Sequence, residues 1–287
     1  MPSRPPAKPR SSNRPCSSAP ASDAGLRSLR VGDLRPGRLR AAGIEAVILD
    51  FDGTLAESSG IWKEVDRVFF ERRGLEFGPE YAERLSVLGF EDGARYTIET
   101  YGLSDTVEQI CDEWNELGRE LYRDRVELRP GVPAYLQGLQ AAGIPYALAT
   151  TNAPEVVLAL EPRLPIRELF PIRVHGCEVA RHTKEDPDIY LEAARQLGVL
   201  TSEDAKALRA DTVAVPAEPA PAAAARARAA LARCLVFEDI LPAIETAARI
   251  GLRTVGVRTR STHQDFAAIQ RAANLTIATW EGLTGEF

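Results

Sequence analysis

The sequence predicts an α/β fold, a Rossmann-like doubly wound parallel sheet with an inserted α-helical cap. In the second half of the chain, short apolar runs rich in β-branched residues, typical of buried strands, alternate with longer amphipathic segments. Glycine follows three of the expected helices at the position where a helix commonly ends. After the first strand, four helical segments follow one another with no strand between them. The alternation favours a parallel sheet, and the helical run marks an insertion into it.

The expected elements can be placed along the chain from these patterns. The strands are expected at residues 45–50, 146–150, 172–175, 235–238, 254–257 and 275–277. The helices between them are expected at residues 132–142, 154–160, 187–197, 241–250 and 262–273. The inserted helices are expected at residues 62–73, 79–88, 92–101 and 105–125. We therefore expect a core at residues 41–55 and 127–287, with a cap at 56–126 over the carboxyl end of the first strand.

Two segments differ in composition from the rest of the chain. Residues 1–40 contain eight Arg, seven Ser and seven Pro but no Glu, which predicts a disordered extension or a targeting peptide. We expect a cytoplasmic protein, or one of a plastid or mitochondrion if this segment is a transit peptide. Residues 201–233 predict a low-complexity insertion with a Pro-Ala centre and a short helix at 222–233. This insertion leads into the N-terminal end of the next strand, so we expect no catalytic residue in it.

Charge and composition exclude several classes of function. The net charge of the 287-residue chain is −6, so no overall basic field favours nucleic acid. The four cysteines are widely separated and the three histidines form no H-E-x-x-H pattern, which argues against a zinc site. No apolar run is long enough to cross a bilayer. We expect no nucleic-acid partner, no membrane association, and a monomer or weak dimer.

The most informative stretch is Asp50-Phe51-Asp52-Gly53-Thr54. Its two carboxylates directly follow an apolar run that predicts a buried strand. Ligands of open α/β sheets bind beyond the carboxyl ends of the strands. An acid pair followed by glycine and a hydroxyl residue suits a hard cation and a phosphate. The simpler alternative is a strand followed by an Asp-Gly turn.

Polar side chains also follow two other strands. Thr150 ends the second expected strand, and Glu238 and Asp239 end the fourth. Lys184 precedes the helix that is expected from residue 187. Each has an ordinary explanation, since strand-terminal Thr, loop Lys and helix-capping acids are all common. Together with Asp50, they bring acids, a hydroxyl and an ammonium group to one edge of the sheet.

On these residues the chain resembles the haloacid dehalogenase superfamily of Mg²⁺-dependent phosphatases, over roughly residues 44–280. The stretch that begins at Asp50 is similar to the first motif of that family, and Thr150, Lys184 and the Glu238-Asp239 pair are similar to the next three. The helical block resembles the cap of subfamily I members such as β-phosphoglucomutase and phosphoglycolate phosphatase.

The resemblance implies a chemical role for each motif. Asp50 would attack phosphorus and form an aspartyl phosphate, which divides one difficult step into two. Asp52 would protonate the leaving group and then activate water as a general base. Thr150 and Lys184 would bind the phosphoryl oxygens.

The same resemblance implies Mg²⁺ as the cofactor. Asp50, the backbone carbonyl of Asp52 and Asp239 would supply three oxygen ligands, with Glu238 in reserve or behind them. Mg²⁺ requires oxygen ligands in near-octahedral geometry and keeps several waters. It is needed because an anionic nucleophile must approach an anionic phosphate.

Two positions depart from the family pattern, and the cap is less informative than the core. Glu185 stands where the family usually has Pro, and Ile240 stands where it often has Ser. Because neither position supplies a core catalytic group, we expect a changed loop geometry or substrate range. The cap is expected to set specificity, and its candidate residues are Trp62, Phe90 and Arg95, whereas Tyr96 is expected in the core of the helical lid.

The expected function is that of a Mg²⁺-dependent phosphatase acting on a small phosphate ester, such as a sugar phosphate, through an aspartyl phosphate. A response-regulator receiver is disfavoured because its acid pair precedes the phosphorylated Asp, and a dehalogenase because it lacks an acid at the position of Asp52. A β-phosphoglucomutase-like mutase is the alternative enzyme, although Trp62 stands where that family has His and Phe90 where it has Arg. A catalytically degenerate binding protein is the non-enzymatic alternative.

Overall fold

A parallel sheet of six strands forms the centre of the computed structural model, which describes residues 28–58, 60–86, 88, 90–181, 183–213, 222–261 and 264–284. The strands are β1 (Ala46–Leu49), β2 (Tyr146–Thr150), β3 (Arg173–His175), β4 (Cys234–Glu238), β5 (Arg253–Val257) and β6 (Leu275–Ile277). Their order across the sheet is β3-β2-β1-β4-β5-β6. The chain starts in the middle and winds outward in both directions, which confirms the predicted Rossmann-like doubly wound fold.

The register brings the carboxyl ends of the three central strands to one edge of the sheet. Leu49, the last residue of β1, pairs with Leu148 of β2 and with Phe237 of β4. The backbone N–H of Asp50 donates to the carbonyl of Phe237 at 3.1 Å, which continues the ladder by one residue. Because these pairings are parallel, side chains that follow neighbouring strands lie close together at this edge.

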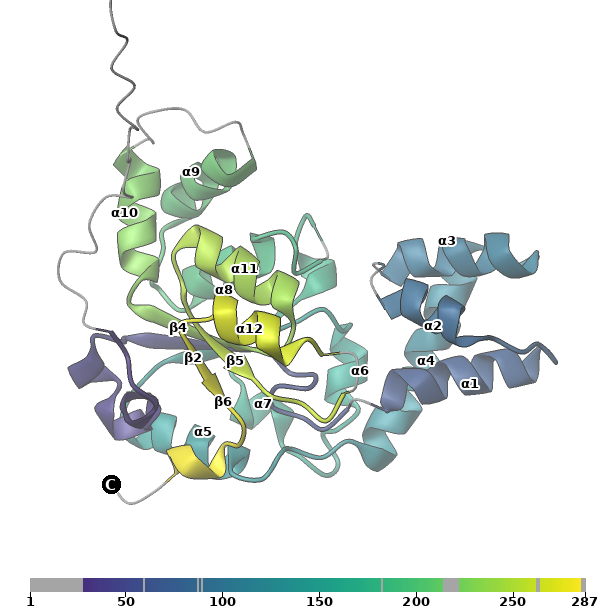
Figure 1. The fold of residues 1–287 in the computed structure, drawn as a ribbon, viewed down its shortest axis with the longest axis horizontal. Helices are drawn as coiled ribbons and strands as arrows, with labels where there is room; N and C mark the ends of the chain where they lie inside the picture. The colour runs from purple at the N-terminus through teal and green to yellow at the C-terminus, as the bar shows by residue number, and fades with distance from the viewer. Residues whose placement is uncertain are drawn as a thin grey trace, which may run out of the picture.

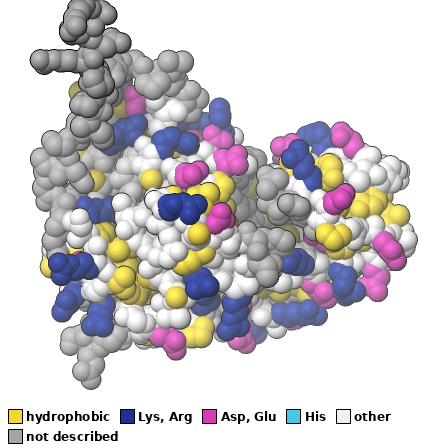
Figure 2. All heavy atoms as spheres, in the orientation of Figure 1, with side chains coloured by type: hydrophobic (Ala, Val, Ile, Leu, Met, Phe, Trp, Pro, Cys, Tyr) yellow, Lys and Arg dark blue, Asp and Glu magenta, His cyan; other side chains and the backbone are white. Residues whose placement is uncertain are grey.

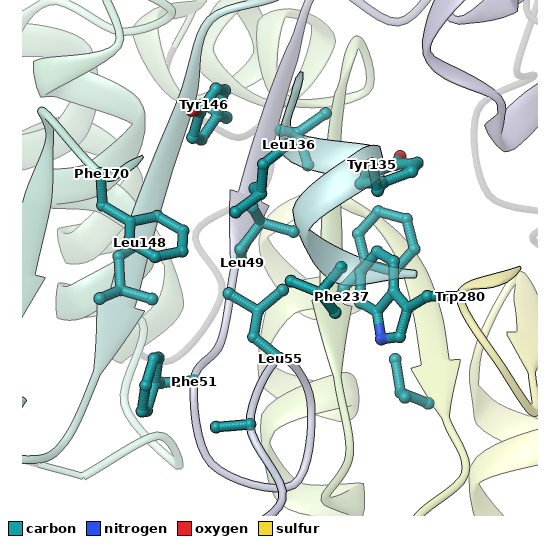
Figure 3. Close-up of a cluster of buried hydrophobic side chains, with 14 of the residues drawn as sticks. Leu49, Phe51, Leu55, Tyr135, Leu136, Tyr146, Leu148, Phe170, Phe237 and Trp280 are labelled. Atoms are coloured by element: carbon teal, nitrogen blue, oxygen red, sulfur yellow. The ribbon is translucent and has the colours of Figure 1, made fainter. Parts of the chain in front are cut away.

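Helices cover both faces of the sheet because successive strand residues point to opposite sides. On one face, Leu49 and Phe237 pack with Tyr135 and Trp280 in a large apolar cluster (Figure 3). This face is covered by α5 (Val132–Ala141), α6 (Pro154–Leu158) and α7 (Ile166–Leu169). The other face is covered by α8 (Asp188–Gln196), α9 (Ser202–Val213), α10 (Ala222–Leu231) and α11 (Leu241–Ile250), and α12 (Phe266–Ala272) packs beside α11 and β6. All four residues of β1 are buried, as expected of a central parallel strand.

The segment after β1 forms a separate bundle of helices beside the sheet (Figure 1). Its helices are α1 (Ile61–Arg72), α2 (Pro79–Ser86), α3 (Phe90–Tyr101) and α4 (Val107–Arg125). The bundle has an apolar core of its own, in which Phe69, Phe70, Tyr81 and Trp114 are buried. The last helix, α4, packs against α6 of the sheet domain. The helices lie where the sequence predicts them, and the bundle is joined to the sheet next to β1.

The expectation of a disordered or targeting segment over residues 1–40 is wrong for its last ten residues. Three short 3-10 helices, Val31–Leu34, Pro36–Arg38 and Arg40–Ala42, precede β1. Leu34 and Leu39 are fully buried in the main apolar cluster, and the Tyr135 hydroxyl donates to the carbonyl of Leu34 at 3.0 Å. The proline in this segment initiates a tight turn instead of preventing packing. Residues 1–27, which include most of the predicted extension, lie outside the described residues.

The insertion expected at residues 201–233 contributes more to the core than its composition indicates. The short helix expected at 222–233 is present as α10, whereas α9 was not expected. The two helices pack against each other, and Leu208, Ala224 and Leu231 are fully buried in the cluster on their face of the sheet. The Pro-Ala centre of the insertion, residues 214–221, lies outside the described residues.

Charged side chains of both signs are interspersed on the visible face of the molecule, over the sheet domain and the helical bundle alike (Figure 2). Within the described ranges, no helix combines the length and the apolar composition that crossing a membrane would require.

Candidate active site

The turn that follows β1 is shaped by Gly53. The backbone N–H groups of Leu55 and Ala56 donate to the carbonyl of Phe51, at 2.9 and 2.8 Å, and close the turn. Gly53 has a φ of 73°, which favours glycine, and a Cβ at this position would overlap the carboxylate of Asp239. The glycine of the motif is therefore required both by the backbone and by the close approach of Asp239.

Lys184 lies between two of the predicted carboxylates. Its Nζ forms ion pairs with Oδ1 of Asp50 and, at 2.7 Å, with Oε1 of Glu238. The Tyr190 hydroxyl donates to the same Glu238 oxygen at 2.7 Å. Lys184 is only 8% exposed and Glu238 is fully buried. Burial lowers the pKa of Lys184, but the charges of Asp50 and Glu238 more than offset this effect and raise it above the ordinary value, so the ammonium group stays charged.

Asp50, Glu238 and Asp239 form a compact carboxylate cluster. One oxygen from each lies within 4.8 Å of the others. Among the described residues, Oδ2 of Asp50 and Oε2 of Glu238 are buried without a hydrogen-bond partner. Burial and then the nearby charge of Asp50 raise the pKa values of Glu238 and Asp239 above their ordinary values. Lys184 offsets only part of this excess negative charge, so the cluster has the unpaired oxygens and the charge that suit a hard divalent cation.

The Asp52 side chain has different partners. Tyr122 donates to its Oδ1, and Asn152 Nδ2 donates to its Oδ2 at 2.6 Å. Burial and then the charge of Asp50 raise the pKa of Asp52 from 3.8 to about 6, although the hydrogen bond from Tyr122 acts in the opposite direction. The two acids of the first motif therefore differ in their partners: Asp50 is paired with a cation, whereas Asp52 is held by neutral donors.

Thr150 lies at the same edge of the sheet, at the end of β2. It is 1% exposed, and its Oγ1 accepts a hydrogen bond from the backbone N–H of Asn152 at 3.2 Å. The backbone carbonyl of Asn152 is hydrogen-bonded at 2.9 Å to Nδ1 of His175, which ends β3. The loop after β2 is thus fixed at the point where it carries both Thr150 and Asn152.

The cap candidates fall into two groups. Trp62 and Phe90 contact each other edge to face, with ring centroids 5.8 Å apart, and Trp62 also lies 6.2 Å from the Tyr122 ring. Phe90 is 40% exposed. Arg95 is exposed and pairs with Asp92 on its own helix, which does not place it near the carboxylates. The Tyr96 ring stacks on the buried Tyr81 ring, as expected of a residue in the core of the bundle.

Glu185 and Ile240, the two positions that depart from the family pattern, have different surroundings. The backbone carbonyl of Glu185 accepts hydrogen bonds at 2.9 Å from Thr246 Oγ1 and from Arg249 Nη2, both on α11. This contact fixes the loop of Lys184 without the usual proline. Ile240 precedes α11 and is 44% exposed, so it presents an apolar side chain next to Asp239.

Sequence reasoning missed three side chains of the site, Tyr122, Asn152 and Tyr190. Asn152 directly follows the predicted Thr150-Thr151 strand end, and Tyr190 lies in the first turn of α8, shortly after the Lys184 loop, so local position offered a signal for both. Tyr122 lies 70 residues from Asp52, near the end of α4, and no local pattern singles it out.

The fold and this constellation together define a class of enzyme. The chain matches the family model of the haloacid dehalogenase-like hydrolases over residues 44–251, and it belongs to this family. The resemblance inferred from the motifs is confirmed, and the chain is an enzyme of the hydrolase class.

Two curated proteins of known name are similar to this chain in sequence. The chain is 27% identical over 169 residues to a phosphorylated carbohydrates phosphatase of Thermotoga maritima, covering 57% of this chain and 78% of the relative. It is 29% identical over 258 residues to the protein CbbY of Cereibacter sphaeroides, covering 84% and 96%.

Solved structures of CbbY from Rhodobacter sphaeroides are also similar. The structure in complex with phosphate has a TM-score of 0.62 at 26% identity and covers 84% of this chain and 97% of its own. A second, in complex with xylulose-(1,5)-bisphosphate, has a TM-score of 0.61 at 25% identity and covers 83% and 95%.

Proposed function

We propose that this hydrolase is a Mg²⁺-dependent phosphatase that cleaves a small phosphorylated sugar, or a similar phosphomonoester, through an aspartyl phosphate on Asp50. The observation that carries the proposal is the pair of acids after β1 with unlike partners, Lys184 for Asp50 and neutral donors for Asp52. The names of the matched relatives, and the phosphate and sugar bisphosphate bound to CbbY, support a phosphoric monoester as the substrate.

Asp50 is the proposed nucleophile. It is the first residue beyond the central strand, and Lys184 holds one of its oxygens, while no donor from the described part of the chain contacts the other. A bond forms from a carboxylate oxygen to phosphorus as the bond from phosphorus to the leaving oxygen breaks. Lys184, as a compact cation, and the Thr150 hydroxyl would hold the phosphoryl oxygens during this transfer.

Asp52 is the proposed general acid and base. Its proton passes to the leaving oxygen in the first half-reaction, and the resulting carboxylate then takes a proton from the water that cleaves the aspartyl phosphate. Efficient proton transfer requires a pKa near the working pH, and the raised pKa of Asp52, about 6, fits this requirement.

Mg²⁺ would be held by Asp50 and Asp239, with Glu238 adjacent. The fit rests on the unpaired oxygens and the uncompensated charge of this cluster. When bound, a divalent cation neutralises charge between the attacking carboxylate and the phosphate. The Asp52 side chain is hydrogen-bonded to Tyr122 and Asn152, so Asp52 would contribute only its backbone carbonyl, the third of the predicted ligands.

Two observations favour hydrolysis over the alternatives. Trp62, at the position where a mutase has His, packs against Phe90 and Tyr122 and offers no group that accepts a proton near neutral pH. Asp50, Lys184 and Glu238, which come from three of the four motifs, are buried and paired with one another, which argues against a degenerate binding protein.

The test is a purified-enzyme screen with p-nitrophenyl phosphate and a panel of sugar phosphates, with Mg²⁺ or with EDTA. We expect release of inorganic phosphate only with Mg²⁺, and a loss of at least about 10³-fold in an Asp50→Asn variant that remains folded. A product that retains phosphate on a different carbon would favour the mutase. An Asp50→Asn variant as active as the wild type would remove the nucleophile assignment.

A further inference from the structure

Asp52, Tyr122 and Asn152 close a ring of three hydrogen bonds. The Tyr122 hydroxyl donates to Oδ1 of Asp52. Nδ2 of Asn152 donates to Oδ2 of Asp52 at 2.6 Å and to the Tyr122 hydroxyl at 2.8 Å. The ring joins the turn after β1, the end of α4 and the loop after β2, which lie far apart in the sequence.

The Tyr122 side chain is buried between aromatic rings, and its backbone is bound by Arg163. It is fully buried, and its ring lies 6.3 Å from that of Phe51 and 6.2 Å from that of Trp62, measured between centroids. Arg163, from the segment after α6, donates to the backbone carbonyls of Tyr122 at 3.0 Å and of Val126 at 2.7 Å. The last carbonyls of a helix lack partners within it, and Arg163 supplies a donor to the carbonyl of Val126. It gives the carbonyl of Tyr122, which also accepts from the backbone N–H of Val126 at 3.3 Å, a second donor. The last turn of α4 is therefore fastened to the sheet domain.

The ring restricts the orientation of the Asp52 carboxyl group. Two donors from different elements hold its two oxygens, so rotation of the group would break at least one hydrogen bond. Each carboxyl oxygen can take part in a second hydrogen bond, and the group therefore remains able to contact a leaving oxygen. A catalytic group that is held in one orientation gains rate because the reacting atoms are in place more often.

We propose that Tyr122 is a positioning residue that holds Asp52 in the orientation in which it protonates the leaving oxygen. The inference rests on the proposed function, in which Asp52 is the general acid. In that step the bond from Asp50 to phosphorus forms, the bond from phosphorus to the leaving oxygen breaks, and the Asp52 proton passes to this oxygen. Tyr122 itself does not contact the reacting atoms, and its effect is transmitted through Asp52.

The experiment compares two substrates whose leaving groups differ in their need for a proton. Phenyl phosphate releases a more basic phenolate than p-nitrophenyl phosphate, so its cleavage depends more strongly on a general acid. We measure kcat/KM because it covers the steps up to phosphoryl transfer and excludes hydrolysis of the aspartyl phosphate. In Tyr122→Phe we expect a loss of about 10- to 100-fold for phenyl phosphate and only a few-fold for p-nitrophenyl phosphate, mainly in kcat.

Two controls separate the possible failures. Asp52→Asn should show the same substrate bias, with a larger loss; if it shows none, the general-acid assignment in the proposed function fails. Tyr81→Phe removes a buried hydroxyl that bonds to Thr97 Oγ1 at 2.7 Å within the helical bundle, and it should show no bias. If Asp52→Asn shows the bias and Tyr122→Phe loses activity equally on both substrates, the positioning role of Tyr122 is overturned while the proposed function stands.

A second variant keeps the inference testable if Tyr122→Phe fails to fold. Asn152→Ala removes the third member of the ring from a different element and should produce the same bias. Because the ring acts as a unit, the Tyr122→Phe/Asn152→Ala double variant should lose little more than either single variant. A soluble Asn152→Ala variant without bias, or losses that multiply in the double variant, would contradict the inference.

Discussion

The ammonium group of Lys184 and the carboxylate of Asp50 form a buried ion pair between residues that are 134 positions apart in the chain. Lys184 is also paired with Glu238, so a single cation faces two carboxylates in an interior with little access to solvent. When one partner of such a pair is removed, the remaining charge is left without compensation. The site is therefore expected to couple catalysis and stability at this lysine.

Replacing Lys184 with Met tests that coupling. We expect kcat/KM to fall by at least about 10²-fold, because the cation that faces the phosphoryl group is lost. Lys184 lowers the pKa of Glu238, so without this cation the folded-state pKa of Glu238 rises further and the variant loses stability as the pH increases. Thermal melting should show a destabilisation of about 3 kcal/mol at pH 8 and a smaller one at pH 5. Lys206→Met, at an exposed position on α9, is the control; equal melting curves for the two variants at pH 8 would contradict the prediction.

Replacing Asp239 with Asn separates metal binding from folding. The lost anionic ligand should raise the Mg²⁺ concentration needed for half-maximal activity. Without metal, the carboxylate is unfavourable in its buried place beside Asp50, so the variant should be at least as stable as the wild type at pH 8. The measurements are an activity titration and melting temperatures with and without Mg²⁺. A variant that Mg²⁺ stabilises as much as the wild type would show that Asp239 is not a ligand.

Replacing Gly53 with Ala tests the steric requirement of the first motif. The added methyl group would overlap the Asp239 carboxylate, and φ would stay in the left-handed region. We expect a loss of activity of more than about 10²-fold through displacement of Asp239, since small misplacements of catalytic groups are costly. Gly74→Ala is the matched control, because Gly74 also has a positive φ of 62° but a Cβ there meets nothing within 4 Å. It should cost about 1 kcal/mol of stability and leave activity unchanged; similar activities of the two variants would refute the steric argument.

Replacing Asp66 with Asn should stabilise the helical bundle in a pH-dependent way. Burial raises the pKa of Asp66 on α1 to about 7, above its ordinary value of 3.8. The folded state thus holds this proton more tightly than the unfolded chain, so stability falls as the pH rises from about 4 to about 7 and this group causes no further loss above that. Asp66→Asn removes that charge and should raise stability by about 1–2 kcal/mol at pH 8, with little effect at pH 4. The check is thermal melting at both pH values, with Asp112→Asn, at an exposed position, as control; a gain that is the same at both values would exclude titration of Asp66 as its cause.

Local sequence determined the strand ends of the site. Asp50, Thr150 and the Glu238-Asp239 pair each follow an apolar run, and a parallel sheet brings such ends to one edge whatever the rest of the chain does. Lys184 was placed by resemblance to a family motif, and the structure brings it between Asp50 and Glu238. The roles of these residues remain predictions, for which the variants above are the tests.

Amino-acid composition predicted less well than strand and helix patterns which segments pack into the core. Residues 1–40 are rich in proline and arginine, yet Leu34 and Leu39 are fully buried. α9 is largely polar in sequence, yet Leu208 is fully buried in the apolar cluster to which α10 also contributes. A few apolar side chains are enough to hold a segment in place when the rest of the fold offers a large apolar surface for them to pack against. The composition of the segment carries no information about that surface.

Only the tertiary structure decided which neutral groups surround the acids. Tyr122 reaches Asp52 because α4 ends against α6 and Arg163 fastens that end, a contact between segments tens of residues apart. The raised pKa values have the same origin, since they follow from burial and from the distances between charges, which exist only in the folded chain. Strand and helix patterns repeat over a few residues and can be read locally, whereas burial and long-range contacts depend on how the whole chain packs. Local sequence therefore determined which side chains stand at the carboxyl edge of the sheet. The tertiary structure determined which groups surround these side chains and how it shifts their pKa values.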